Sequence, residues 1–284
     1  MSTAVITFTY NESVNLPIWL RYYGANFGEN NLYVVDRGSD DHSLDHIGEA
    51  NLLKVPRKKF DEFEKTNFMA MFHRSLLNFY DTVIITDCDE ILVPDPEKFS
   101  NLREYVEGSD FDYVSSIGLD VLHILSEEHP IDFARPLLSQ RQYGRFHSPC
   151  CKILVSRVPV EWLPGFHSAN RPPKFDGILY LFHTKAMDYG AAIKRQDINR
   201  DTVWSDRSLA QNLGAHHRFD IRQFVHQFFL VPADLVNRSQ VQDFEFSAER
   251  QKIISEADER NGYYYIPMNL SKLVRIPDRF ASAF

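Results

Sequence analysis

The sequence predicts an α/β protein built around a largely parallel sheet, and three observations support this class. Short apolar runs alternate with amphipathic segments over the first ninety residues, as in consecutive strand–helix–strand units. The run Val83-Ile84-Ile85 is apolar throughout, as in a strand that is buried on both faces. Hydrophobic residues make up 44% and charged residues 25% of the 284 residues, which is typical of a globular protein with a sizeable core.

The elements of the first half follow in order. A strand is expected over 4–9, followed by a helix that has Pro17 in its first turn and apolar residues at helical spacing up to Phe27. A second strand covers 32–35 and ends at Asp36, before a turn-rich segment, a short helix and a brief third strand near 52–55. A helix over about 64–80 then leads into a fourth strand at 83–85.

The second half is less regular. Strands are expected at 111–117, 151–155 and 177–183, with polar loops between them. After His183 the chain turns mainly helical, with helices near 188–196, 206–213 and 247–260. We therefore expect a core over residues 1–200 and a helical C-terminal extension over residues 201–284 that packs on it.

Composition excludes several classes of protein. A formal net charge of −8 and a pI near 5.8 argue against sequence-independent binding of nucleic acid, which needs a basic surface. No apolar stretch approaches the roughly 20 residues that span a bilayer, although peripheral membrane association stays open. The start of the chain has no basic leader, and three cysteines make no disulfide framework. A cytoplasmic setting is expected.

Two carboxylates, Asp87 and Asp89, follow the fourth strand directly. In extended chain they would share one side, with Cys88 packed on the other side as a small hydrophobe and Glu90 beside it. Two oxygen donors at a strand end suit Mg²⁺ or Mn²⁺ with positions left open for phosphate oxygens. Because right-handed crossovers bring the carboxyl ends of parallel strands to one edge, the loop after the first strand, Asp36 and these acids should meet in one crevice.

Several motifs, taken together, resemble a known family. Tyr10-Asn11-Glu12, Val35-Asp36-Arg37-Gly-Ser-Asp-Asp and Ile85-Thr-Asp87-Cys-Asp89-Glu90 resemble the family 2-like glycosyltransferases with the GT-A fold. Cys151-Lys152, Gly165-Phe-His167 and Leu181-Phe-His183-Thr-Lys185 are similar to a bacterial polysaccharide-synthesis branch of that group. The resemblance covers residues 4 to 195 and implies a nucleotide-binding half over 1–95 and an acceptor half over 96–200. It also implies metal-dependent, inverting transfer of a hexose-type sugar from a nucleotide diphosphate sugar to a glycan or lipid-linked acceptor.

The resemblance further implies roles for single residues around the nucleotide. Asp36 would accept a hydrogen bond from the nucleobase, unless it is only a turn-capping aspartate before Gly38. Asp87 would face ribose or metal, and Asp89 would bind the metal directly. The remaining side chains expected to border the nucleotide sugar are Asn11, Glu12, Lys65, Asn67 and Lys185, with Lys194, Arg195 and Arg200 as further cations for the phosphates.

A histidine is expected to complete the metal shell, because imidazole suits Mn²⁺ better than Mg²⁺. We favour His183, with His167 as its rival, although either can equally be a satisfied half-buried residue. The general base that activates the acceptor hydroxyl is assigned to Asp120, which follows a predicted strand, with Glu127, Glu128 and His129 as alternatives.

Other functions stay open at this stage. Haloacid dehalogenase-like phosphatases also carry an apolar strand ending in Asp-x-Asp, but there the motif usually opens the domain, whereas three strand candidates precede it here. A nucleotidyltransferase would normally carry a glycine-rich phosphate loop after the first strand, and residues 10–15 contain no glycine. A non-catalytic nucleotide- or sugar-binding module would keep the same fold.

Overall fold

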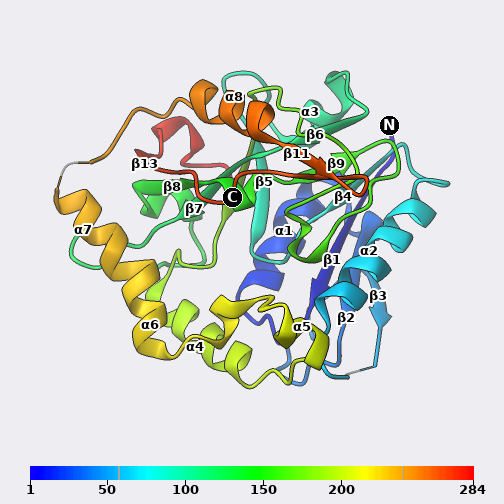
Figure 1. Cartoon of the computed structure of the whole chain (residues 1–284), viewed down its shortest axis with the longest axis horizontal. Coiled ribbons are helices and arrows are strands. Elements are labelled where there is room, and N and C mark those ends of the chain that lie inside the picture. The colour runs from blue at the N-terminus through cyan, green and yellow to red at the C-terminus, as the bar shows by residue number, and fades with distance from the viewer. Residues whose placement is uncertain (57, 239) are drawn as a thin grey trace.

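The computed structural model describes residues 1–56, 58–238 and 240–284, and it contains two mixed sheets (Figure 1). The six-stranded sheet has the order β3 (Asn51–Lys54), β2 (Leu32–Asp36), β1 (Thr3–Thr9), β4 (Thr82–Ile85), β9 (Ile153–Ser156) and β6 (Tyr113–Ser115). Strands β3, β2, β1 and β4 are parallel, whereas β9 is antiparallel to both of its neighbours. The order reverses between β1 and β4, which creates a topological switch point of the Rossmann-like kind.

The five-stranded sheet has the order β13 (Ser271–Arg275), β8 (Tyr143–His147), β7 (Ile117–Val121), β10 (Leu179–His183) and β5 (Glu90–Pro94). Within it β7 and β10 are parallel and the other pairs are antiparallel. A separate ribbon pairs β11 (Asp258–Arg260) with β12 (Tyr263–Tyr265). The predicted class, α/β with mixed sheets flanked by helices, is confirmed.

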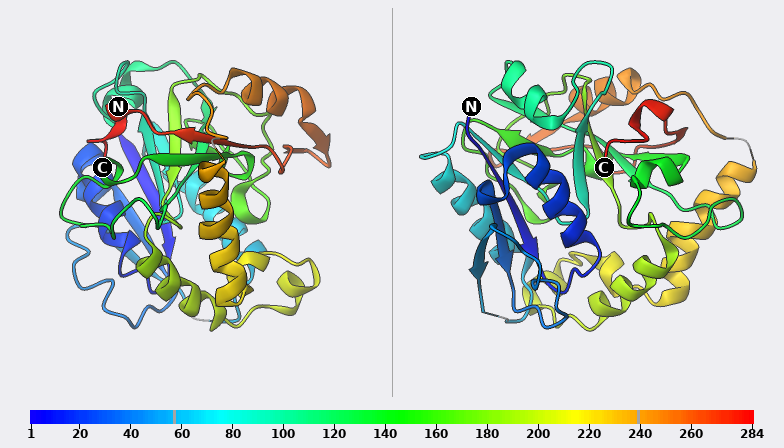
Figure 2. Two further views of the ribbon diagram at one scale, coloured as in Figure 1. Left: turned by 90° about the vertical axis from the view of Figure 1, so that its left-hand side faces the viewer. Right: turned by 180° about the vertical axis from the view of Figure 1, so that it is seen from behind.

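Helices α1 (Asn15–Phe27) and α2 (Glu62–Leu76) cover opposite faces of the six-stranded sheet. Side chains alternate along β1, so Val5 packs with the α1 residue Trp19 in one core cluster, whereas Ile6 packs with the α2 residue Met69 in another. Figure 2 shows α1 in blue and α2 in cyan on the two sides of the blue strands. The carboxylate of Asp61 caps α2 by accepting hydrogen bonds from the first turn. Helix α3 (Leu102–Gly108) packs against α1 and β5.

The chain after β10 is largely helical up to residue 256, as predicted. It forms α4 (Tyr189–Arg200), α5 (Asp206–Ala210), α6 (Ile221–Val225), a π-helical turn (His226–Leu230), α7 (Val231–Asn237) and α8 (Ser247–Glu256). Helices α4 to α7 follow the lower and left-hand edges of Figure 1. The C-terminal segment then places β13 beside β8, so the predicted extension supplies an edge strand to the core. The division at residue 200 stays a prediction. In the described part of the chain, no helix is long and apolar enough to cross a membrane.

Three short connections carry the chain from one sheet to the other: residues 86–89 between β4 and β5, Ser116 between β6 and β7, and residues 148–152 between β8 and β9. The single strand expected at 111–117 is therefore two strands in different sheets. Asp87 and Asp89 lie in a tight turn, in which the Glu90 amide donates to the Asp87 carbonyl at 3.1 Å, and not in extended chain as expected. The short helix expected before β3 is a series of turns.

Candidate functional site

A cavity of about 600 Å³ lies where the two sheets meet, at the carboxyl ends of β1, β4 and β10. Residues from the loop after β1, the turn after β4, the end of β8, and helix α4 line it. Eleven of the predicted site residues line this cavity, namely Asn11, Glu12, Lys65, Asp87, Asp89, Asp120, His167, His183, Lys185, Lys194 and Arg195. These residues meet because strand ends of parallel units gather at one sheet edge, and their functional role stays a prediction.

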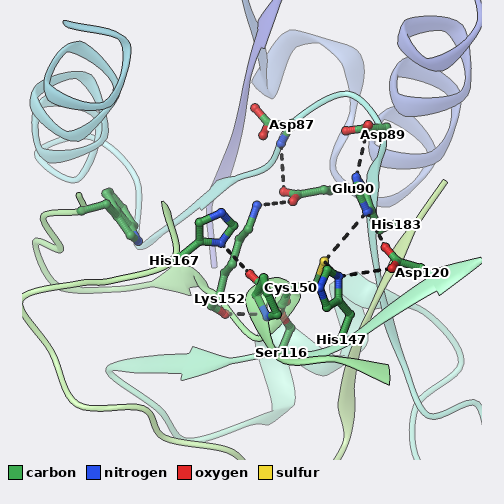
Figure 3. Close-up of polar contacts among 12 residues, drawn as sticks. Asp87, Asp89, Glu90, Ser116, Asp120, His147, Cys150, Lys152, His167 and His183 are labelled. Carbon is green, nitrogen blue, oxygen red and sulfur yellow. Dashed lines mark hydrogen bonds and ion pairs between the residues drawn. The ribbon is translucent and has the colours of Figure 1, made fainter. Parts of the chain in front are cut away.

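Lys65 and Lys152 form ion pairs that hold the acid turn in place, and Figure 3 shows the contacts of Glu90 with Lys152 and Asp87. Lys65 on α2 donates to the Asp87 carboxylate at 2.9 Å. Burial would lower the pKa of this lysine, but the charges of Asp87 and Glu62 raise it. Glu90 accepts a hydrogen bond from the Asp87 amide at 3.2 Å and forms a buried ion pair with Lys152. Glu90 was expected beside Cys88 on the far side, but the turn aims its carboxylate into the cavity. Cys88 itself is buried against Thr7, as expected for a small hydrophobe.

A chain of contacts joins Asp89 to Asp120 through His183. The Nε2 atom of His183 lies 3.3 Å from Asp89 Oδ2, and its Nδ1 atom lies 2.8 Å from Asp120 Oδ1 (Figure 3). Burial would lower the pKa of His183, but the charges of Asp89 and of the nearby Cys150 raise it well above its usual value. Burial would likewise raise the pKa of Asp89, but His183 holds it well below the usual range. His183 is therefore a protonated bridge between two carboxylates.

Asp120 has a different environment from the one expected of a general base. Besides His183, its carboxylate contacts Arg145 Nη2 at 2.8 Å and His147 Nδ1 at 3.2 Å, and the residue is only 4% exposed. Burial acts to raise the pKa of Asp120, but these three partners hold it well below its usual value. A carboxylate with so weak an affinity for protons orients its neighbours better than it takes a proton from an acceptor hydroxyl.

Glu12 and Asn11 enter the cavity from the loop after β1. Glu12 pairs with Arg195 of α4 at 2.8 Å, and the same guanidinium donates to the carbonyl of Asn11 at 2.8 Å. Asn11 adopts a left-handed backbone conformation with φ of 52°, which asparagine tolerates, and its side chain is tied to Asp40. Arg195 thus locks the first loop against α4, a role that the sequence pattern did not show.

Burial raises the pKa of Glu12 to about 7, with Arg195 opposing the rise and the charges of Asp89 and Asp87 adding to it. Because the unfolded chain releases this proton near pH 4.5, the folded protein binds more protons between pH 4.5 and 7 and loses stability as the pH rises through that window. Relative to a Glu12→Gln variant, the free energy of unfolding of the wild type should fall by roughly 2–3 kcal/mol between pH 5 and pH 8. Urea unfolding of both proteins across this range measures the difference. Parallel pH profiles for the two proteins would contradict the assignment.

Three predicted residues, Asp36, Asn67 and Arg200, are not among those that line the cavity. Asp36 is buried at the end of β2, and its carboxylate accepts hydrogen bonds from Gly38 N at 3.1 Å and from Ser39 N at 2.9 Å. It therefore caps its own turn, which was the alternative reading, and contact with a nucleobase stays a prediction. Asn67 lies on the opposite face of α2 from Lys65, because positions two apart on a helix do not share a face, and it borders a separate pocket.

The histidine rival and the predicted lysine have distinct surroundings. His167 contacts the carbonyl of Pro149 at 2.7 Å through Nδ1, and burial lowers its pKa to about 3, so it is neutral. Lys185 lies over the ring of Phe228, and burial lowers its pKa to about 8 despite the charges of Asp89 and Asp120.

The structure also adds lining residues that sequence reasoning did not assign to the site, among them Arg145, His147, Cys150, Lys152, His216 and His217. Only the spacing His147-x-x-Cys150 carries a recognisable signal.

The cavity residues fit a hard divalent cation at the acid turn. The carboxylates of Asp87 and Asp89 lie close enough to Glu12 to raise its pKa. A divalent cation such as Mg²⁺ or Mn²⁺ stabilises oxygen donors that repel one another in this way. Asp87 pairs with Lys65 at 2.9 Å and Asp89 with His183 at 3.3 Å, so Asp89 has the longer of the two contacts and is the better placed ligand. His183 contacts carboxylates with both ring nitrogens and supports Asp89 from its Nε2 side.

Comparisons with known proteins find structural likeness only at a distance. No protein-family model and no curated protein matches the sequence. Among solved structures, residues 1–349 of TarS from S. aureus are 12% identical over 89% of this chain and 77% of that chain, with a TM-score of 0.34. Mannose-1-phosphate geranyltransferase from Thermus thermophilus is 10% identical over 81% and 71%, with a TM-score of 0.29. CMP:2-keto-3-deoxy-manno-octonic acid synthetase complexed with CTP is 12% identical over 76% and 85%, with a TM-score of 0.27. At these TM-scores the likeness transfers no function, so the assignment below rests on the chain's own residues.

Proposed function

We propose that this protein is a metal-dependent glycosyltransferase that moves a sugar from a nucleotide diphosphate sugar to a glycan or lipid-linked acceptor with inversion. The supporting observation is the charge arrangement in the cavity at the switch point. Carboxylates of the acid turn, with Asp89 foremost, share this cavity with Lys65, Lys185 and Arg195. A nucleoside diphosphate that chelates a divalent cation matches both sets of charges, because the metal suits the acids and the phosphates suit the cations.

Each group at the diphosphate end has a defined task in this proposal. Asp89 holds Mn²⁺ or Mg²⁺, and the Nε2–H group of His183 fixes the orientation of that carboxylate. The bound metal supplies positive charge where the leaving diphosphate accumulates negative charge. Lys185 adds a donor on the same side; with a pKa of about 8 it is mostly protonated at neutral pH, and a phosphate beside it would strengthen its charged form. Lys65 keeps the acid turn in register through Asp87.

The nucleoside end is proposed to lie along the loop after β1. The Arg37 guanidinium sits 4.9 Å from the ring centroid of Tyr10 and 4.6 Å from that of Phe60, so it lies over both rings. All three line the cavity, and planar guanidinium and aromatic groups suit a nucleobase or ribose. Asn11 and Glu12 border the same region.

Binding of a nucleoside diphosphate is the first test of the proposal. Thermal denaturation is followed with each nucleoside diphosphate and nucleotide sugar in Mn²⁺ and, in parallel, in EDTA. A cognate ligand at 100 times its Kd adds about 2.7 kcal/mol to the stability of the native state, which raises Tm by roughly 5 °C for a chain of this size. The matching nucleoside monophosphate, which lacks the second phosphate, should shift Tm less. Absence of any Mn²⁺-dependent shift across the four bases would overturn the proposal.

Product formation separates the enzyme from a non-catalytic binding module and from a phosphatase. The enzyme should release a nucleoside diphosphate only when a donor sugar is supplied, and faster with an acceptor than without one. A binding module shows the Tm shift without turnover, and a phosphatase releases inorganic phosphate from simple phosphate esters. The anomeric configuration of the product, read by NMR, tests inversion.

A further inference from the structure

Four side chains that commonly bind metals converge beside the cavity, and the proposed sugar transfer gives no task to the thiol among them. Cys150 Sγ lies 3.9 Å from His183 Nδ1 and 4.0 Å from His147 Nδ1. Asp120 reaches the same two nitrogens, at 2.8 Å and 3.2 Å (Figure 3). The donor atoms of Asp120, Cys150 and His183 all lie within 4.8 Å of one another. We propose that Asp120, His147, Cys150 and His183 bind a zinc ion.

The distances among Asp120, Cys150 and His183 suit a tetrahedral ion of this size, and His147 is proposed as the fourth ligand from its contacts with Asp120 and Cys150. With zinc bonds of 2.0–2.1 Å to nitrogen and about 2.3 Å to sulfur, neighbouring donor atoms lie about 3.3 Å apart, or about 3.5 Å where one is sulfur. The Cys150 contacts at 3.9 and 4.0 Å need to shorten by a few tenths of an ångström, and the shortest oxygen–nitrogen contact needs to lengthen by as much. A thiolate with two imidazoles and one carboxylate selects Zn²⁺ over Mg²⁺ and Mn²⁺, which prefer oxygen donors.

The fold builds this cluster from three adjacent elements. Strands β7 and β10 are parallel neighbours, and their register sets Asp120 directly beside His183. His147 ends β8, and the short turn that follows brings Cys150 back to it. A side chain at Gly118 on β7 would place its Cβ 2.3 Å from the Cβ of Cys150, so only glycine lets this turn lie against the strand. The next residue, Cys151, faces away from the cluster and accepts a hydrogen bond from Gly118 N at 3.4 Å.

The outer contacts of the cluster are those that metal ligands require. The Nε2 atom of His183 faces Asp89 at 3.3 Å, which is the carboxylate–histidine–metal arrangement that fixes the ring and its tautomer. Arg145 donates to Asp120 Oδ2 at 2.8 Å and leaves Oδ1 for the metal. Zinc displaces the thiol proton and the protons on the Nδ1 atoms of His147 and His183, and His183 keeps its Nε2–H for Asp89. The zinc ion uses Nδ1 of His183, whereas the diphosphate metal uses the carboxylate of Asp89 that the Nε2–H group orients, so both sites can be filled together.

Metal content tests the zinc site without any nucleotide or sugar. Untagged wild-type protein is stripped with EDTA, dialysed against zinc, freed of excess metal and analysed by inductively coupled plasma mass spectrometry. Wild type and the control Cys151→Ser should each retain about one zinc ion per chain. The Cys150→Ser variant should bind zinc more than about 100-fold more weakly, because even changes to outer contacts cost 10–100-fold.

Cobalt substitution supplies a readout in the wild type itself. Co²⁺ in this site should show a thiolate-to-metal charge-transfer band and the intense visible bands of tetrahedral cobalt, and both should persist in Cys151→Ser. Three results would overturn the site: wild-type protein that binds neither metal, a cobalt complex of the wild type without the thiolate band, or a Cys150→Ser variant that binds zinc as tightly as the wild type. If Cys150→Ser does not fold, the cobalt spectrum of the wild type decides the matter. These results stand whichever way the nucleoside diphosphate screen turns out, so the two proposals fail separately.

Discussion

The Asp89→Asn variant is expected to lose metal-dependent binding of nucleoside diphosphates and to transfer sugar about 10³-fold more slowly than the wild type, a loss of roughly 4 kcal/mol of transition-state stabilisation. Asparagine keeps the shape of the side chain but removes the charge that attracts the divalent cation. Folding should survive, because the change also removes one of the charges that raise the pKa of Glu12. Titration calorimetry with and without Mn²⁺ measures binding, and kcat/KM measures transfer.

A matched control separates this effect from a general change of charge. Asp234 lies on α7, is half exposed and pairs with Arg238 in the next turn, so Asp234→Asn should leave Mn²⁺-dependent affinity unchanged. The melting temperatures of both variants report whether the fold is intact. Equal nucleoside diphosphate affinity in wild type and Asp89→Asn, with Mn²⁺ making no difference to either, would remove the metal assignment.

The Lys152→Met variant should unfold with a free energy about 3–5 kcal/mol lower than that of the wild type, because it leaves the Glu90 carboxylate buried without its partner. The side chains of this pair are only 5% and 3% exposed. Burial would lower the pKa of Lys152, but the charges of Glu90 and Asp87 raise it, so the ammonium is fully charged at neutral pH. Urea-induced unfolding at pH 7 measures the loss.

A double-mutant cycle identifies the cause of this loss. Adding Glu90→Gln to Lys152→Met removes the buried charge that has lost its partner, and it should restore part of the lost free energy of unfolding. If the two sites were independent, the double variant would lose the sum of the two single losses. The exposed Lys98 serves as the control, and Lys98→Met should change the free energy of unfolding by less than about 0.5 kcal/mol. Additive losses in the double variant would show that Lys152 and Glu90 are not energetically coupled.

Local pattern in the sequence was enough for the first half of the fold. The apolar run at Val83-Ile84-Ile85 and the helical spacing from Leu16 to Phe27 gave elements within a few residues of β4 and α1. The same reasoning gathered the loop after β1 and the acids after β4 at one sheet edge, since right-handed crossovers leave parallel strands no other arrangement. These features depend on neighbours in sequence, which is why periodicity predicts them.

Side-chain direction at the site was decided by tertiary structure. Whether Asp87 and Glu90 face one way or opposite ways depends on the turn by which the chain leaves β4 for the second sheet, and no period-two pattern describes that turn. The partner Lys152 comes from the connection before β9 and His183 from the end of β10, both far along the chain, and β13 reaches β8 across more than a hundred residues. The sequence by itself determined the class of fold and the edge of the sheet where the candidate residues gather. The pairing of each carboxylate with its cation, like the contact of Cys150 with two histidines and Asp120, follows only from contacts between distant segments. The sequence does not predict these contacts, because they leave no periodic pattern in the chain.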